Sequence, residues 1–126
     1  MNKTVYTWRD VEEYIKGVCE KYKGIDLSGV YGIPRGGLIL AVMISHRMKL
    51  PLLLAPVRNC LIVDDICDSG ESLLHYKKNS SSLNKPLYHI TTMVHKENPL
   101  VQPEYYSKEK NDDWIVFPWE DNECIE

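Results

Sequence analysis

Residues 61–72, Leu-Ile-Val-Asp-Asp-Ile-Cys-Asp-Ser-Gly-Glu-Ser, are the stretch that decides the fold. The apolar run at its start predicts a buried strand, which delivers Asp64 and Asp65 to its C-terminal end. The small-residue turn that follows opens a predicted helix, so backbone N–H groups and the helix dipole converge there as they do at anion sites. The acidic pair fits the two hydroxyls of a ribose, and the turn fits a phosphate.

Crowded carboxylates set this stretch apart from an ordinary strand end. Asp64, Asp65 and Asp68 follow one another closely, and they would repel one another without a cation or a hydroxyl-rich ligand. The structural alternative is a strand that ends in a turn, with Asp68 as the N-cap of the next helix. That alternative does not explain the acidic pair, so we interpret the segment as a binding site.

The segment resembles the phosphoribosyl pyrophosphate (PRPP) signature of the type I phosphoribosyltransferases. This resemblance implies that Asp64 and Asp65 hold the ribose of PRPP. It also implies that Asp68 is the catalytic residue, which accepts a proton from the N7 atom of a purine. The residues expected to bind the 5′-phosphate are Ser69, Gly70, Glu71 and Ser72.

The composition of the chain is that of one globular domain. The chain has 126 residues, 44% of them hydrophobic and 26% charged, which favours a single domain over residues 1–126. We expect a cytoplasmic protein without membrane contact, because no apolar run could span a bilayer and the N-terminus does not resemble a signal peptide. A formal net charge of −3 argues against a nucleic-acid partner.

The four cysteines are expected to be reduced. They form no C-x-x-C pair and no zinc pattern with histidines. Cys67 lies in the expected phosphate region, where it is either a small filler side chain or a redox-sensitive thiol. The others are Cys19, Cys60 and Cys124.

Helices and strands alternate along the chain. Apolar residues at helical spacing predict a first helix over residues 7–23, capped by Thr7 and ended by Gly24. Apolar strands separated by helices require a parallel sheet covered on both faces, so the predicted fold is an α/β three-layer sandwich with a mainly parallel sheet. Strands are expected at 30–33, 52–55, 61–64, 88–94 and 114–119, further helices at 38–48 and 73–79, and a loop at 97–113.

The turn Pro34-Arg35-Gly36-Gly37 precedes the second helix and is the candidate pyrophosphate loop. Its glycines allow a ligand to approach the backbone, Arg35 adds a positive charge, and the helix that follows offers free N–H groups. Type I phosphoribosyltransferases have such a loop, and the resemblance implies a cis peptide between Pro34 and Arg35. A tight turn with an exposed arginine is the alternative.

Two further segments resemble those that bind the base in bacterial xanthine-guanine and hypoxanthine phosphoribosyltransferases. The resemblance implies that Lys96 recognises the purine O6, that Trp114 stacks on the base, and that the backbone of Ile115 reads its edge. It also implies that Glu120, with Asp65, contacts the cofactor Mg²⁺. The alternatives are a solvated lysine and a tryptophan that packs in the core.

One departure from the family concerns the flexible lid. Relatives have a long loop between the second strand and the acidic strand, whereas only residues 56–59 separate the run 52–55 from Cys60. The lid is therefore expected to be deleted, and a site without it excludes water less well.

The resemblance implies transfer of the 5-phosphoribosyl group from PRPP to a 6-oxopurine, which is a purine salvage reaction. The partners would be PRPP and guanine, xanthine or hypoxanthine, in a homodimer or homotetramer. A PRPP-binding or nucleotide-binding sensor without turnover is the alternative that the missing lid leaves open.

Overall fold

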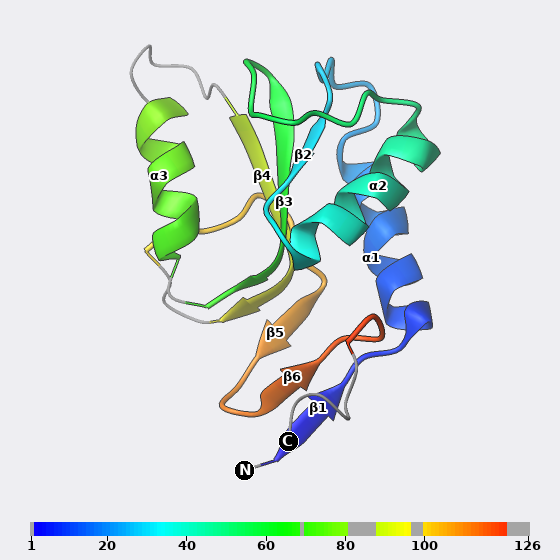
Figure 1. Ribbon diagram of the computed structural model, residues 1–126, viewed down its shortest axis with the longest axis vertical. Helices are drawn as coiled ribbons and strands as arrows, with labels where there is room; N and C mark the ends of the chain where they lie inside the picture. Colours follow the sequence, from blue (N-terminus) through cyan, green and yellow to red (C-terminus); the bar gives the residue numbers. More distant parts are fainter. Residues whose placement is uncertain (1, 69, 81–87, 97–99, 121–126) are drawn as a thin grey trace.

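A four-stranded parallel sheet, in the order β2-β3-β4-β5, is the centre of the computed structural model, which describes residues 2–68, 70–80, 88–96 and 100–120 (Figure 1). The two long strands pair from Cys60 with Tyr88 to Cys67 with His95. The strand bounds are β2 (Val30–Gly32), β3 (Cys60–Cys67), β4 (Tyr88–Lys96) and β5 (Lys108–Lys110).

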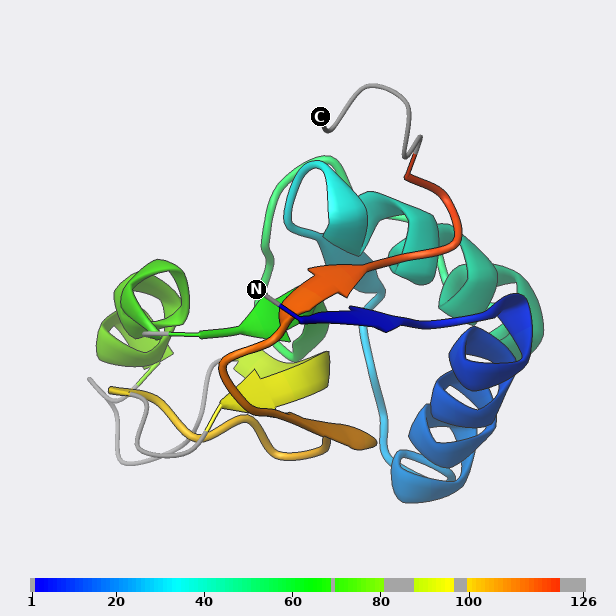
Figure 2. The same ribbon diagram turned by 90° about the horizontal axis from the view of Figure 1, so that it is seen from below.

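Helices cover both faces of this sheet. The helices α1 (Trp8–Lys21) and α2 (Gly36–Met48) lie on one face and α3 (Glu71–Ser80) on the other, as Figures 1 and 2 show. The larger core packs α1 and α2 against the sheet through residues such as Val11, Leu40 and Val63. The smaller core lies under α3 and includes Ile62 and Leu73. The predicted three-layer α/β sandwich is therefore confirmed.

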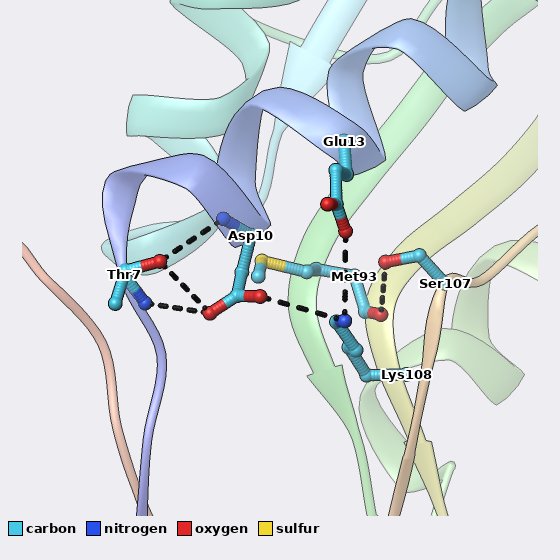
Figure 3. A network of polar contacts seen from close by, with 6 residues as sticks. All are labelled: Thr7, Asp10, Glu13, Met93, Ser107 and Lys108. Atoms are coloured by element: carbon cyan, nitrogen blue, oxygen red, sulfur yellow. Dashed lines mark hydrogen bonds and ion pairs between the residues drawn. The ribbon is translucent and has the colours of Figure 1, made fainter.

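The first helix begins where its sequence predicts. The Thr7 side chain accepts a hydrogen bond from the backbone N–H of Asp10 (3.3 Å), and the Asp10 carboxylate accepts one from the backbone N–H of Thr7 (2.8 Å), which is a capping box (Figure 3). After the helix the chain turns at Gly24, whose φ of 81° lies in the region that glycine adopts without strain.

The prediction of a strand at residues 52–55 is wrong. Only Leu52 forms a bridge, to Val30, and Leu54 is 96% exposed. The pairing with β2 is limited to two hydrogen bonds, from the Val30 N–H to the Pro51 carbonyl (2.9 Å) and from the Leu53 N–H to the Val30 carbonyl (2.8 Å), and the chain then bends at residues 54–55. Residues 49–59 alone connect α2 with β3, and they contain no lid.

Three short strands differ from the sequence-based expectation. Strand β1 (Lys3–Val5) was not predicted, and it pairs in parallel with β6 (Trp114–Val116) to form a second, two-stranded sheet (Figure 2). The expected strand at 114–119 is thus shorter. Strand β5 lies in the segment 97–113, which was predicted to be a loop. It was missed because its sequence, Lys-Glu-Lys, has no alternation of apolar and polar residues, and such a charged strand is typical of a sheet edge.

None of the helices in these described ranges is long and apolar enough to cross a membrane.

Candidate active site

Three strand ends bring charged side chains together at one edge of the main sheet. Asp68 follows β3, while Lys96 and Lys110 are the last residues of β4 and β5 and are register partners. Lys96 Nζ lies 3.6 Å from Asp68 Oδ1, and Lys110 Nζ lies 3.8 Å from the same oxygen. The proximity of Asp68 and Lys96 agrees with the prediction that they share this edge, whereas Lys110 was missed.

The glycine loop lies against the acidic strand. The Pro34–Arg35 peptide is cis, as the resemblance implied. A methyl group on Gly36 would overlap the Asp65 carboxylate, and one on Gly37 would overlap the Val63 carbonyl oxygen. Both glycines are therefore required for this close packing, which joins the predicted pyrophosphate loop to the predicted ribose site.

The N-terminus of α2 is open to an anion. Arg35 occupies the N-cap position without a capping side-chain hydrogen bond, and the first turn contains no acidic residue. The helix itself therefore supplies no carboxylate to neutralise the positive end of its dipole, and the carboxylate that packs against Gly36 there is that of Asp65 from β3. Arg35 is itself exposed, so its guanidinium can reach a ligand bound at this end of the helix.

The acidic pair lies inside β3, because the strand continues to Cys67 beyond the predicted end at residue 64. The Asp64 Oδ1 accepts a hydrogen bond from the backbone N–H of Asp65 (2.9 Å). Burial, followed by the negative charge of Asp65, raises the pKa of Asp64 to about 8. Hydroxyl donors or a cation would therefore stabilise the ionised pair, and a metal-bound ribose would supply such groups.

The phosphate turn is described in part. Gly70 has a φ of 84°, and a methyl group on it would lie 2.9 Å from the backbone nitrogens of Leu100 and Val101. This conformation and this contact both require glycine. Glu71 begins α3. Ser69 lies outside the described residues, as does the Ser72 side chain, so their role toward phosphate stays a prediction.

Two of the expected base-binding residues, Trp114 and Ile115, lie on β6. Trp114 is 50% exposed, and its backbone N–H donates to the Asn2 carbonyl (2.9 Å). The Val116 carbonyl accepts from Tyr6 in the same ladder. Because successive strand residues direct their backbone groups to opposite sides, the N–H and C=O of Ile115 point away from β1. The exposed indole and this backbone orientation agree with stacking and edge recognition.

The described residues would supply only part of the ligands of a magnesium site. No group of three or more His, Cys, Asp or Glu among the described residues is arranged to hold a metal ion. The Glu120 Oε1 accepts a hydrogen bond from the backbone N–H of Phe117 (2.9 Å), so it has a partner within its own turn. Mg²⁺ bound with nucleotide phosphates needs only one or two carboxylates, and the oxygens of Asp64 and Asp65 fit that need. The role of Glu120 stays a prediction.

Cys67 packs as a small buried side chain, and its surroundings do not favour a reactive thiol. It is buried, and its thiol donates to the Val101 carbonyl (3.4 Å). Burial, with smaller contributions from the charges of Asp64 and Asp68, raises the pKa of Cys67 to about 11. A thiol that stays protonated is a poor nucleophile. Cys19, Cys60 and Cys67 are free, and Cys124 lies outside the described residues.

His95 packs beside the site, in agreement with a structural role. It is 4% exposed, and its ring lies 4.4 Å from that of Tyr106, measured between centroids.

Known proteins are similar to this chain in sequence and in structure. No protein-family model matches the chain. The xanthine-guanine phosphoribosyltransferase of Chromohalobacter salexigens is 25% identical over 138 aligned residues, which cover 90% of this chain and 82% of the relative. The purine phosphoribosyltransferase of Pyrococcus horikoshii superimposes with a TM-score of 0.81 and 29% identity over 96% of both chains.

A further likeness concerns the fold alone. The xanthine-guanine-hypoxanthine phosphoribosyltransferase of Helicobacter pylori has a TM-score of 0.77 and 21% identity, with 98% of this chain and 97% of that chain covered. In fold and in sequence the chain is similar to purine phosphoribosyltransferases, which supports the resemblance to the bacterial 6-oxopurine enzymes of the type I family.

Proposed function

We propose that the protein transfers the 5-phosphoribosyl group of PRPP to a 6-oxopurine, namely guanine, xanthine or hypoxanthine, in purine salvage. The similarity to purine phosphoribosyltransferases indicates a transferase. The observation on which the choice of base depends is the Lys96–Asp68 pair, 3.6 Å apart at the sheet edge. It offers a hydrogen-bond donor and an acceptor side by side, as the O6 and N7–H of a 6-oxopurine require.

The ribose end of the site would stabilise the separation of charge. When the C1′–O bond to pyrophosphate breaks, positive charge develops on the ribose and negative charge on the leaving group. Asp64 and Asp65 hold the ribose hydroxyls, while Arg35 and the N-terminus of α2 bind the pyrophosphate. Bound Mg²⁺ would neutralise phosphate charge, with an oxygen of Asp65 among its ligands.

The base end would handle one proton. As the purine N9 forms its bond to C1′, the proton on N7 moves to the Asp68 carboxylate, which acts as the general base. Lys96 donates to O6, and this favours 6-oxopurines over adenine, whose exocyclic amine is itself a donor. Trp114 stacks on the ring from β6.

A PRPP-binding sensor without turnover is the second candidate. The short connection over residues 49–59 favours it, because no lid closes from there over the site. Residues that would read a base argue against it, since a sensor of PRPP needs neither Lys96 nor an exposed Trp114.

The test is incubation of the purified protein with Mg²⁺, PRPP and guanine, hypoxanthine, xanthine or adenine in turn, with nucleotide formation followed by chromatography. We expect a nucleoside 5′-monophosphate from at least one 6-oxopurine and none from adenine. PRPP binding by calorimetry without any product would replace the enzyme by the sensor. The cytoplasmic location and the homodimer or homotetramer stay predictions.

A further inference from the structure

A second lysine contacts the proposed general base. Lys110 Nζ lies 3.8 Å from Asp68 Oδ1, close to the 3.6 Å of Lys96. Both distances exceed those of a hydrogen bond, so each contact is an ion pair. Because Lys96 and Lys110 are paired across parallel strands, their side chains leave the same face of the sheet.

The two lysines differ in their freedom to move. The Lys110 side chain is 15% exposed, whereas that of Lys96 is 41% exposed and that of Asp68 is 52% exposed. A lysine ammonium is rarely covered to this degree without a partner of opposite charge. Asp68 is the acidic partner that the described residues provide for Lys110.

The strand that carries Lys110 is itself held in place. Lys108, on the same strand, lies 3.5 Å from Asp10 Oδ1 and 3.7 Å from Glu13 Oε2 of α1 (Figure 3). The preceding Ser107 donates its backbone N–H to the Met93 carbonyl (3.1 Å). These contacts join β5 to helix α1 and to strand β4. They therefore hold the backbone from which the Lys110 side chain extends.

We propose that Lys110 is the positioning residue of this site: it holds the Asp68 carboxylate in place when Lys96 turns from Asp68 to the base. This inference rests on the proposed function, in which Lys96 must give up its ion pair to donate to O6. Of the two ion-pair partners that the described part of the chain gives Asp68 Oδ1, Lys110 then remains. The covered lysine thus keeps the general base aimed at N7, and the exposed lysine recognises the substrate.

Paired lysine variants test this division of roles. Lys110→Met should lower kcat by about a hundredfold, the effect expected of a misplaced catalytic group, with the KM for PRPP unchanged. Lys96→Met should mainly raise the KM for the purine. Lys110→Arg keeps a cation at the position and should recover much of the lost kcat. Lys16→Met, on the exposed face of α1, is the control for loss of a surface lysine.

Crystal structures of the two methionine variants give a readout that needs no turnover. We expect Asp68 to keep its position beside Lys110 in Lys96→Met, and to leave it in Lys110→Met. If Asp68 stays in place in Lys110→Met, or if that variant retains the kcat of the wild type, the positioning role is wrong. If the wild type transfers to no base, the proposed function fails, and the crystal structures still decide whether Lys110 holds Asp68. Thermal melting of each variant excludes loss of folding as the cause.

Discussion

Replacing Asp64 by asparagine should change how the stability of the unliganded protein depends on pH. Burial and the charge of Asp65 raise the pKa of Asp64 to about 8 in the folded protein, from 3.8 for an ordinary aspartate. The folded state therefore keeps this proton to higher pH than the unfolded chain does. The resulting stabilisation is full below about 3.8 and is lost as pH rises through about 8.

The size of the effect follows from these two values. One pKa unit corresponds to about 1.4 kcal/mol, and proton linkage then removes about 2 kcal/mol from the free energy of unfolding between about pH 6.5 and about pH 8.5. For a domain of this length, that loss lowers Tm by about 8 °C. Asparagine cannot ionise, and its Oδ1 can still accept the hydrogen bond from the backbone N–H of Asp65.

Thermal melts of wild type and Asp64→Asn at both pH values isolate the contribution, because other titrating groups are common to the two proteins. The Tm of the wild type should fall by about 8 °C more than that of the variant. Asp26→Asn, at an exposed position, is the control and should follow the wild type. Equal pH dependence in wild type and Asp64→Asn would refute the reasoning and show that Asp64 is already ionised near neutral pH.

Three further substitutions test other parts of the molecule. Asp68→Asn should retain PRPP binding by calorimetry yet lose roughly 10²–10⁴-fold in transfer rate, and an unchanged rate would remove Asp68 from catalysis. Gly36→Ala places a methyl group against the Asp65 carboxylate, so we expect PRPP binding to weaken by about tenfold or more, and unaltered binding would contradict the loop packing. Tyr14→Phe removes a buried 2.9 Å hydrogen bond to Thr91 and should lower the urea-unfolding free energy by about 1 kcal/mol, without an effect on PRPP affinity.

The parts of the fold that follow from local sequence were predictable. The capping box at Thr7 and the apolar run of β3 depend only on residues that are close in the sequence. The structure has helix α1 and strand β3 where these patterns predict them. The run at 52–55 has the composition of a strand, but its pairing with β2 ends after Leu53 and the chain bends at residues 54–55, which composition alone does not reveal. Strand β1 forms only because β6 lies beside it, and no local pattern records a partner more than a hundred residues away.

The site residues likewise divide into those that the local sequence predicts and those that only strand pairing places. Asp68 and Lys96 follow apolar strands, so their position at one sheet edge can be derived from the sequence. Lys110 stands in a polar, charged segment that resembles a solvated loop, and only the register of β5 with β4 places it beside Asp68. Its signal in the sequence was the alternation of Lys108 and Lys110 about Glu109, which is weak in so short a strand.

Without a lid, the site excludes water from only part of its surface. Asp64 is partly buried and the Lys110 side chain is 15% exposed, whereas the side chains of Asp68 and Lys96 are 52% and 41% exposed. Electrostatic interactions are stronger where water is excluded. The proposed ribose end of the site is therefore the less exposed part, and the proposed base end is open to solvent. In the transfer proposed above, a purine stacked on Trp114 would itself be the cover that keeps water from C1′, so transfer would depend on Trp114 more than in an enzyme that closes a loop.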